Sequence, residues 1–530
     1  MNRLVFMAVG GSGERVFTSF MMALTAGMHV NADSVLPIII DNDAESHSLT
    51  DCKNLIDYYR KEGKANDSKV GANTLYSMAF GQDKSKWPSF FETVVEEPIY
   101  LDSDGGNIGS LRTVIGNLTE EMADISEERD LLFTDRDLDM PLDGGFIGNP
   151  NIGSVVLNAI ALHDTRYSGK HGEISNQDGV VVVGSLFGGT GAAGIPLIVN
   201  KFKEKGTNCP HIGVISLLPY FTTVTDDKFA GPGKWDVFSD MFDVKTRAAL
   251  MYYADYMQDV DVQYYVGDRN CKAVYKHHIS GDKQNNAAHP IEVMAALCAI
   301  DFSKGQFENS IIYKRPIWSF SDGKDPLSSN LSDVSNVEFR KNIVKFQMLK
   351  WIMTSNDLLK ERISEDSPFV HDIGFKEEMR EAVVTDNDQK IGQFPYAWGV
   401  NNLFHYWDEW IKALTNPRNI VASKRKMSFF KDDEVKEENF TQMFYTDNEN
   451  GWGIANTIQV SDGFLHPFSR HQEPQPPELK TILVKAYDNL VKTKVIPNKD
   501  DVVEDDKKLP YLLRIISDAL DMVIMDKCSL

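Results

Sequence analysis

The feature that most constrains this chain is a short apolar run that breaks into glycines. Val180 to Val183 are consecutive valines, and the segment from Gly184 to Gly194 is rich in glycine. Such a β-branched run predicts a strand buried on both faces of a parallel sheet. Glycines permit positive φ and close approach of the backbone to an anion, toward which the N–H groups of a following helix point. The segment therefore predicts a phosphate-binding turn between a strand and a helix.

This turn differs from two familiar phosphate-binding motifs. It has no lysine followed by Ser or Thr, as the P-loop requires, and it lacks the G-x-G-x-x-G spacing of dinucleotide-binding folds. Thr190 adds a hydroxyl donor. For any single glycine turn, a tight connection without a ligand is the alternative. The residues of this turn that we expect to bind a ligand are Gly188, Gly189, Thr190, Gly191 and Ala192.

Three other segments share the pattern of a strand, a turn and a helix start. Residues 3–9 predict a strand that ends in a glycine turn, and residues 37–40 predict one that ends in acidic residues. Residues 144–153 carry an Asn-Pro-x-x-Gly core before an apolar helix. The residues of these turns that we expect at the ligand are Gly10, Gly11, Ser12, Gly13, Asp41, Asp43, Gly145, Gly148 and Asn149. Because loops at the carboxyl ends of parallel strands converge on one crevice, the four turns predict a shared site.

The four segments, in this order, resemble the nucleotide-binding loops of the tubulin/FtsZ superfamily. Gly188 to Gly194 resembles the signature loop G-G-G-T-G-[ST]-G with one glycine fewer, and residues 144–153 resemble the loop G-A-G-A-N-P-E-V-G of FtsZ relatives. Residues 41–45 resemble the N-T-D-A-Q turn, with Asp43 at the acidic position. A dinucleotide-binding fold is the other interpretation of the first turn. Val16 weakens it, because that motif needs a small residue there.

The resemblance implies an α/β fold: a tubulin/FtsZ-like, Rossmann-type GTPase domain with a mostly parallel sheet and a central helix. This domain would cover residues 1–310, with a large insertion at about 57–140. We expect a second domain at 311–470, either α+β or mostly helical, and a helical extension at 471–530. The carboxyl-terminal region would thus be largely helical. Apolar residues at helical spacing predict helices at 337–363, 398–414, 478–492 and 511–525.

The resemblance also suggests residues that read the base. In relatives an asparagine after the strand that precedes the central helix reads guanine, and here Asn270 follows the strand predicted at 262–266. The central helix is predicted at 291–302, with Pro290 in its first turn and Asn286 just before it. Asp268 and Asn270 are therefore the candidates for reading the base, and Asn286 is a further candidate for binding the nucleotide.

Relatives place a catalytic acid in the loop after the central helix. Its pattern is G-x-x-N-x-D, and the acid activates water on the nucleotide of the neighbouring subunit. Here Glu308 stands at the asparagine position and Ser310 at the aspartate position. Hydrolysis needs a group within hydrogen-bond reach of the attacking water. The candidate acids are therefore Glu308, displaced by two residues, and Asp301, near the end of the helix.

Three functions follow from these observations as expectations. The first is a GTP/GDP-binding protein, with Mg²⁺ on the nucleotide, that associates with itself longitudinally into filaments and completes GTP hydrolysis between subunits. The second is a tubulin-like scaffold or sensor with little hydrolysis, which the altered acid position favours. The third is a dinucleotide-dependent α/β enzyme, which leaves the turns at 144–153 and 188–194 without a role.

Composition limits the partners. The formal net charge is −22 over 530 residues, which argues against general binding to nucleic acid or to anionic membranes. The five cysteines do not have the spacing of a metal-binding motif, so we expect no metal site. We expect them to be free thiols in a reducing, cytoplasmic compartment. No apolar run of about eighteen residues predicts a membrane span. Protein partners, if any, would bind the acidic insertion or the carboxyl-terminal helices.

Overall fold

The computed structural model describes most of residues 1–315 and four helices beyond them. The described residues are 1–43, 46–60, 74–101, 109–119, 126–142, 145–146, 148–160, 172–224, 241–257, 259–267, 273–276, 287–305, 307, 311–315, 336–354, 395–415, 476–498, 501 and 503–527.

Within these residues, seven parallel strands form one sheet in the order β3-β2-β1-β4-β5-β7-β9, and β6 and β8 form a separate parallel pair. The predicted α/β class with a mostly parallel sheet is confirmed. The strands are β1 (Arg3–Val9), β2 (Ser34–Ile40), β3 (Ile99–Leu101), β4 (Gly179–Ser185), β5 (His211–Leu217), β6 (Phe221–Val224), β7 (Val262–Val266), β8 (Ala273–Lys276) and β9 (Ile312–Lys314).

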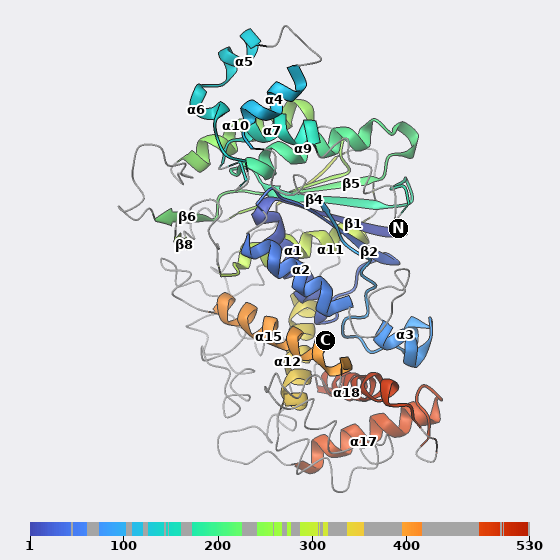
Figure 1. The fold of residues 1–530 in the computed structure, drawn as a ribbon. Coiled ribbons are helices and arrows are strands. Elements are labelled where there is room, and N and C mark those ends of the chain that lie inside the picture. Colours follow the sequence, from blue (N-terminus) through green and yellow to red (C-terminus); the bar gives the residue numbers. More distant parts are fainter. Residues whose placement is uncertain are drawn as a thin grey trace.

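Helices cover both faces of the sheet (Figure 1). They are α1 (Gly10–Thr25), α2 (His47–Arg60), α3 (Thr74–Phe80), α4 (Leu111–Thr119), α5 (Ser126–Leu132), α6 (Asp135–Leu138), α7 (Pro150–Ile160), α9 (Gly189–Lys203), α10 (Phe242–Tyr256), α11 (Pro290–Lys304), α12 (Asn336–Thr354), α15 (Pro395–Thr415), α17 (Pro476–Lys492) and α18 (Asp505–Lys527). Two short 3₁₀ turns are η1 (Lys84–Lys86) and η3 (Gly206–Asn208).

The central strands contribute side chains to two apolar cores, one on each face of the sheet, because neighbouring side chains of a strand point to opposite faces. In β1, Leu4 and Phe6 join the core beneath α1 and α11, whereas Val5 and Met7 join the core beneath α7 and α9. The valines of β4 divide in the same way and are fully buried. The buried run that the sequence predicts is thus the centre of the sheet.

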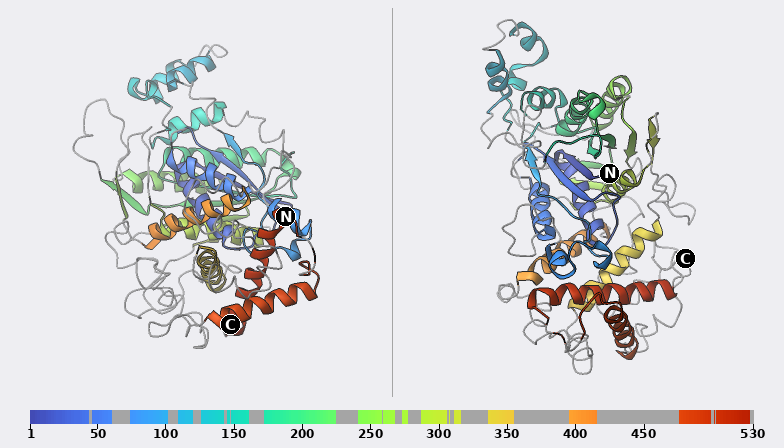
Figure 2. Two further views of the ribbon diagram at one scale, coloured as in Figure 1. Left: turned by 60° about the horizontal axis from the view of Figure 1, so that its bottom comes forward. Right: turned by 90° about the vertical axis from the view of Figure 1, so that its right-hand side faces the viewer.

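The carboxyl-terminal helices pack against the first of these cores. α12 contacts α1, α15 contacts α2, and α18 contacts α3 (Figures 1 and 2). The indole N–H of Trp410 donates to Ser19 Oγ at 3.1 Å. Lys345 Nζ lies 2.6 Å from Asp521 Oδ2 and 2.5 Å from Ser89 Oγ, so a buried lysine joins α12, α18 and the segment before β3. The predicted domain boundaries at 310 and 470 stay predictions.

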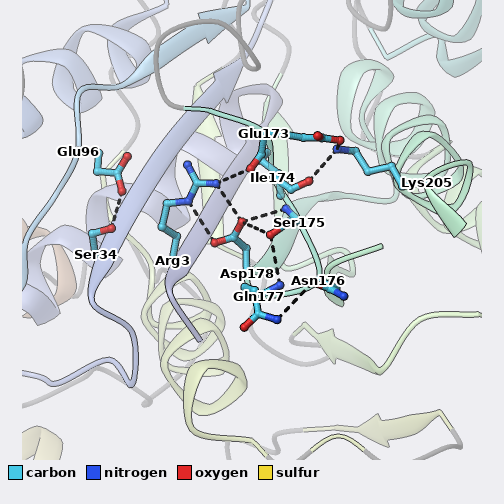
Figure 3. Close-up of polar contacts among 10 residues, drawn as sticks. All are labelled: Arg3, Ser34, Glu96, Glu173, Ile174, Ser175, Asn176, Gln177, Asp178 and Lys205. Carbon is cyan, nitrogen blue, oxygen red and sulfur yellow. Dashed lines mark hydrogen bonds and ion pairs between the residues drawn. The ribbon is translucent and has the colours of Figure 1, made fainter. Parts of the chain in front are cut away.

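The amino edge of the sheet is fixed by an ion pair between β1 and the segment before β4 (Figure 3). Arg3 donates from Nε and Nη2 to both oxygens of Asp178, at 3.1 and 2.9 Å. The N–H of Ser175 donates to the same carboxylate at 3.0 Å. Burial favours the neutral acid, yet the hydrogen bonds from Arg3 and Ser175, with the charge of Arg3, together hold the pKa of Asp178 below its usual range. The predicted loops lie at the opposite, carboxyl edge of the sheet.

One predicted helix begins earlier than expected. α18 begins at Asp505, six residues before the predicted start at Tyr511, and it continues through Pro510. Charged residues such as those at 505–508 are compatible with a helix, and packing of the later turns overrides the proline. α12 covers residues 336–354, and residues 355–363 of the predicted helix lie outside the described residues. Across the described helices, none is long and apolar enough to cross a membrane.

Candidate nucleotide-binding site

The crevice of the sheet lies between β1 and β4, where the strand order reverses direction. β2 and β3 extend from β1 on one side, and β5, β7 and β9 extend from β4 on the other. The helices that follow these two strands pack on opposite faces, α1 in one core and α9 in the other. In open α/β sheets this point, at the carboxyl ends of the strands, is where ligands bind.

Two helices begin at this crevice without a side-chain cap. α1 starts at Gly10 after Val9, and α9 starts at Gly189 after Gly188. Among the described residues no side chain accepts a hydrogen bond from either helix start, and neither first turn contains an acidic residue. The first N–H groups of a helix have no partner inside it and carry partial positive charge. The crevice therefore presents two sets of backbone donors to an anion.

The first and fourth loops touch directly. Gly10 has φ +73°, and a Cβ there would lie 3.0 Å from Thr190 Cβ. Gly191 is pressed against the end of β4, since a Cβ would lie 2.6 Å from the carbonyl oxygen of Ser185. α1 approaches the sheet closely at Gly13, where an added Cβ would lie 2.6 Å from Val183 O. The dinucleotide-binding motif would have this close approach at the position of Val16. Glycine at these positions permits the close packing of both turns.

The third loop packs against the fourth. A Cβ at Gly189 would lie 2.8 Å from Phe146 Cβ, 3.1 Å from Asn149 N and 3.2 Å from Gly148 N. Gly148 has φ +69°, a conformation that other residues rarely adopt. Asn149 precedes α7, and Pro150 is the first residue of that helix, so the helix begins inside the segment that the sequence places before it. The start of α9 is thus enclosed by the loop before α7.

The second loop lies against both the first and the third loop. A Cβ at Gly11 would lie 3.9 Å from Glu14 Oε2 and 4.0 Å from Asp41 Oδ2, and a Cβ at Gly145, whose φ is +80°, would lie 3.9 Å from Asp43 Cβ. The four predicted loops therefore meet at one edge. Ser12 and Ala192 lie in the first turns of α1 and α9 beside these glycines.

Acidic side chains lie under the first and second loops. Glu14 is fully buried and accepts a hydrogen bond from Ser48 Oγ at 2.6 Å. Burial, with Asp41 as a second negative charge nearby, raises the pKa of Glu14 well above its usual value. Burial also raises the pKa of Asp41 to about 7. Within the described part of the chain no three metal-ligating side chains are arranged to hold a metal ion.

A buried ion pair that the sequence did not predict joins α1 to α11. Arg15 Nη2 lies 2.5 Å from Glu292 Oε1, and Tyr220 Oη donates to the same oxygen at 2.7 Å. Arg15 also donates to Tyr275 Oη at 3.1 Å and lies over that ring. Burial opposes the charge of Arg15, but Glu292, Tyr220 and Tyr275 together outweigh it and raise the pKa of the guanidinium. The available signal was Glu292 itself, an acid in the first turn of a largely apolar helix.

His289 caps α11. Its Nδ1 accepts from Ile291 N at 3.1 Å, and Glu292 Oε2 accepts from His289 N at 2.9 Å. The two residues are three positions apart, so they lie on one side of the helix and form a capping box. The start of α11 therefore lies at the carboxyl edge of the sheet, beside Tyr220, whose ring centroid is 5.0 Å from that of His289.

A second side chain that sequence reasoning missed is Lys245, from α10. Its Nζ lies 2.5 Å from the carbonyl oxygen of Gly148, and burial lowers its pKa. On the same helix, Phe242 packs against Phe187 of the signature loop, with ring centroids 4.6 Å apart. α10 thus supports the third and fourth loops from one side.

The candidate catalytic and base-reading residues are placed less completely. Asp301 is buried at the far end of α11, where its Oδ2 accepts from Tyr264 Oη at 2.6 Å and lies 2.5 Å from Lys314 Nζ. Because α11 begins at the carboxyl edge, Asp301 does not reach the crevice of its own chain. Glu308, Asp268, Asn270 and Asn286 lie outside the described residues.

The described elements define an open, parallel α/β protein with four loops gathered at the carboxyl edge of its sheet. No protein-family model matches the sequence, and no curated protein matches it. The geometry of the crevice is therefore the basis for inferring a function.

Proposed function

We propose that the chain is a guanine-nucleotide-binding protein of the tubulin/FtsZ type, with GTP or GDP held at the carboxyl edge of the sheet. The observation that carries the proposal is the pair of uncapped helix starts at Gly10 and Gly189, which face one crevice. A di- or triphosphate would accept hydrogen bonds from both sets of N–H groups. The glycines keep side chains out of that space.

The arrangement of the elements supports the same family. α11 follows β7, begins at the carboxyl edge beside Tyr220 and ends beside Lys314 of β9. The resemblance implies a central helix of this kind, with one end at the nucleotide and the other at the opposite edge. The nucleotide would bring Mg²⁺ with it. Phosphate oxygens would supply ligands, because the described residues contain no complete metal site.

Longitudinal self-association into filaments is part of the proposal. In a head-to-tail stack, the loop after α11 of one subunit would face the crevice of the next. Glu308 would then be the acid that orients water on the terminal phosphate. Only such a stack would make turnover depend on assembly.

A scaffold or sensor with little hydrolysis is the second candidate. Asp301, the other candidate acid, is buried and engaged by Lys314 and Tyr264, which makes it a poor base for water. If Glu308 also lacks a catalytic role, the protein would bind nucleotide and report its state without turnover.

The decisive experiment identifies the copurifying nucleotide and compares two glycine variants. Gly189→Ala places a Cβ 2.8 Å from Phe146 Cβ and should displace the third and fourth loops. Gly206→Ala is the control: its glycine also has positive φ, +58°, but no atom lies within 4 Å of the added Cβ. Guanine nucleotide should bind the wild type and Gly206→Ala, while Gly189→Ala should lose at least about tenfold in affinity and keep its circular dichroism spectrum.

The outcomes separate the candidates. Turnover that rises more steeply than linearly with protein concentration supports the filament GTPase, and bound GTP without turnover supports the scaffold. Copurifying nicotinamide or flavin dinucleotide would overturn both. Equal affinity of Gly189→Ala and Gly206→Ala would reject the four-loop crevice as the site.

A further inference from the structure

α10 has an apolar face that the described part of the chain does not cover. Nine large apolar side chains are strongly exposed in that part, and five of them lie on α10 or immediately before it. These five are Met241 (46% exposed), Val244 (58%), Met251 (67%), Tyr252 (43%) and Tyr256 (62%). Single exposed apolar residues are ordinary, but a gathered group marks an interaction surface.

The other side of α10 is firmly packed, so its exposed face is a fixed surface. Phe242, Thr246 and Tyr253 are buried, and Tyr253 belongs to the core shared with α9. α10 lies on the same side of the sheet as α7 and α9 (Figure 1). The rings of Tyr252 and Tyr256 stack on one another, 4.6 Å apart.

The exposed face of α10 carries a cation and an anion at equal sequence distances from Met251. Arg247, Met251 and Asp255 are all exposed and follow one another at intervals of four residues. Residues at this interval form one ridge along a helix. Next to Met251 the ridge therefore carries Arg247 on one side and Asp255 on the other, and the exposed Asp243 lies one turn before Arg247. Neither Arg247 nor Asp255 forms an ion pair with another described residue.

We propose that this face of α10 pairs with the same face of a second copy of the chain about a two-fold axis near Met251. In an antiparallel pair of helices, Arg247 of each copy lies opposite Asp255 of the other, one turn from the axis on either side. Met251 meets its own counterpart, and the apolar side chains of the neighbouring ridge cover the contact. A two-fold interface requires a self-complementary patch of this kind.

The charge distribution favours pairing with a second copy at the exposed face of α10 over pairing at most other parts of the surface. The net charge of −22 makes two copies repel over most of their surfaces. On the ridge of α10, one cation and one anion flank Met251 at the proposed axis, and Asp243 lies farther from the axis. Two-fold pairing would bring Arg247 of each copy opposite Asp255 of the other and so form two intermolecular ion pairs.

The contact is independent of the longitudinal stack proposed above. Head-to-tail stacking can continue without limit and would need nucleotide, whereas a two-fold contact closes after two copies. A pair of single helices buries less than the roughly 1,200–2,000 Å² of a typical stable interface, so the dimer should dissociate on dilution.

The test is a charge exchange in the full chain, free of nucleotide, followed by sedimentation equilibrium over a wide concentration range. Arg247→Glu places two acids opposite each other on both sides of the axis, and should raise the dimer dissociation constant at least about tenfold. Asp255→Arg should do the same through two cations. The double variant Arg247→Glu/Asp255→Arg restores both opposite-charge pairs, and its dissociation constant should return to that of the wild type.

A second pair of variants tests the apolar centre. Met251→Glu should abolish the dimer, while Leu131→Glu, at an 84% exposed position on α5, should leave it intact. All these side chains are exposed, so unchanged circular dichroism is expected for every variant. A wild type that is monomeric at all concentrations would overturn the proposal, leaving the face for a different protein. A double variant as weak as the single ones would equally overturn the two-fold register.

Discussion

Replacing Asp41 with Asn should make the protein more stable at neutral and mildly alkaline pH. Asp41 is 7% exposed at the end of β2, with Glu14 and Asp43 as its acidic neighbours. Burial raises its pKa from 3.8 to about 7, so the fold disfavours the charged form. The asparagine side chain keeps the shape of the carboxyl group and removes the charge.

The magnitude follows from the difference between the folded and unfolded pKa of Asp41. Between pH 4 and pH 7, approximately, the folded state binds more protons than the unfolded state, so stability falls as pH rises. About three pKa units at 1.36 kcal/mol each give about 4 kcal/mol lost by pH 8 relative to pH 4. The pKa of Glu14 should also fall in Asp41→Asn, because Asp41 contributes to raising it.

The assay is urea unfolding at pH 5 and at pH 8, followed by tryptophan fluorescence, without nucleotide or divalent cations. Asp488→Asn, at an exposed position on α17, is the control for the same chemical change. Asp41→Asn should gain stability over the wild type at pH 8 and much less at pH 5, while Asp488→Asn should follow the wild type at both.

The reasoning would be refuted if Asp41→Asn were less stable than the wild type at pH 8. That result would mean that the folded state holds the carboxylate charged and compensated, as by a bound cation. An equal effect at both pH values would instead show that the substitution acts through packing and that no proton uptake accompanies folding.

Two further predictions concern the buried charges and the candidate acid. Arg15→Met should cost about 3–5 kcal/mol in urea unfolding because Glu292 is left buried without its cation, and the double variant Arg15→Met/Glu292→Gln should recover much of that loss. Glu308→Ala should lower GTP turnover of the assembled protein at unchanged nucleotide affinity. Asp301→Asn should instead lower thermal stability with turnover kept; the reverse pattern would mean that Asp301 is the acid.

The sequence predicted those parts of the fold whose causes are local. β1 runs from Arg3 to Val9 as expected, because its apolar run is bounded by a glycine turn that any sheet would need there. Pro290 opens α11 for a similarly local reason, since its fixed φ suits a first helical turn. The convergence of the four loops followed from the rule that parallel strands end at a common edge.

The parts that could not be predicted depend on contacts between distant segments. The partner of Arg15 is set by how α1 and α11 cross, which neither helix encodes alone. Asp301 looked available as an acid because its helix ends nearby, but β9 brings Lys314 onto it. In the same way, the packing of α1 on the sheet brings Gly13 against Val183 O of β4, a contact that the sequence pattern did not indicate.

α10 connects the crevice to the face proposed for pairing. It contacts the loops through Phe242 on Phe187 and through Lys245 on Gly148, and it carries the exposed ridge on its other side. If nucleotide changes the pairing equilibrium through these contacts, thermodynamic linkage requires pairing to change nucleotide affinity by the same factor. Arg247→Glu should then change nucleotide affinity only at concentrations where the wild type pairs. Identical nucleotide affinity at every concentration would mean that α10 holds one position in both states, and that pairing and binding are separate properties.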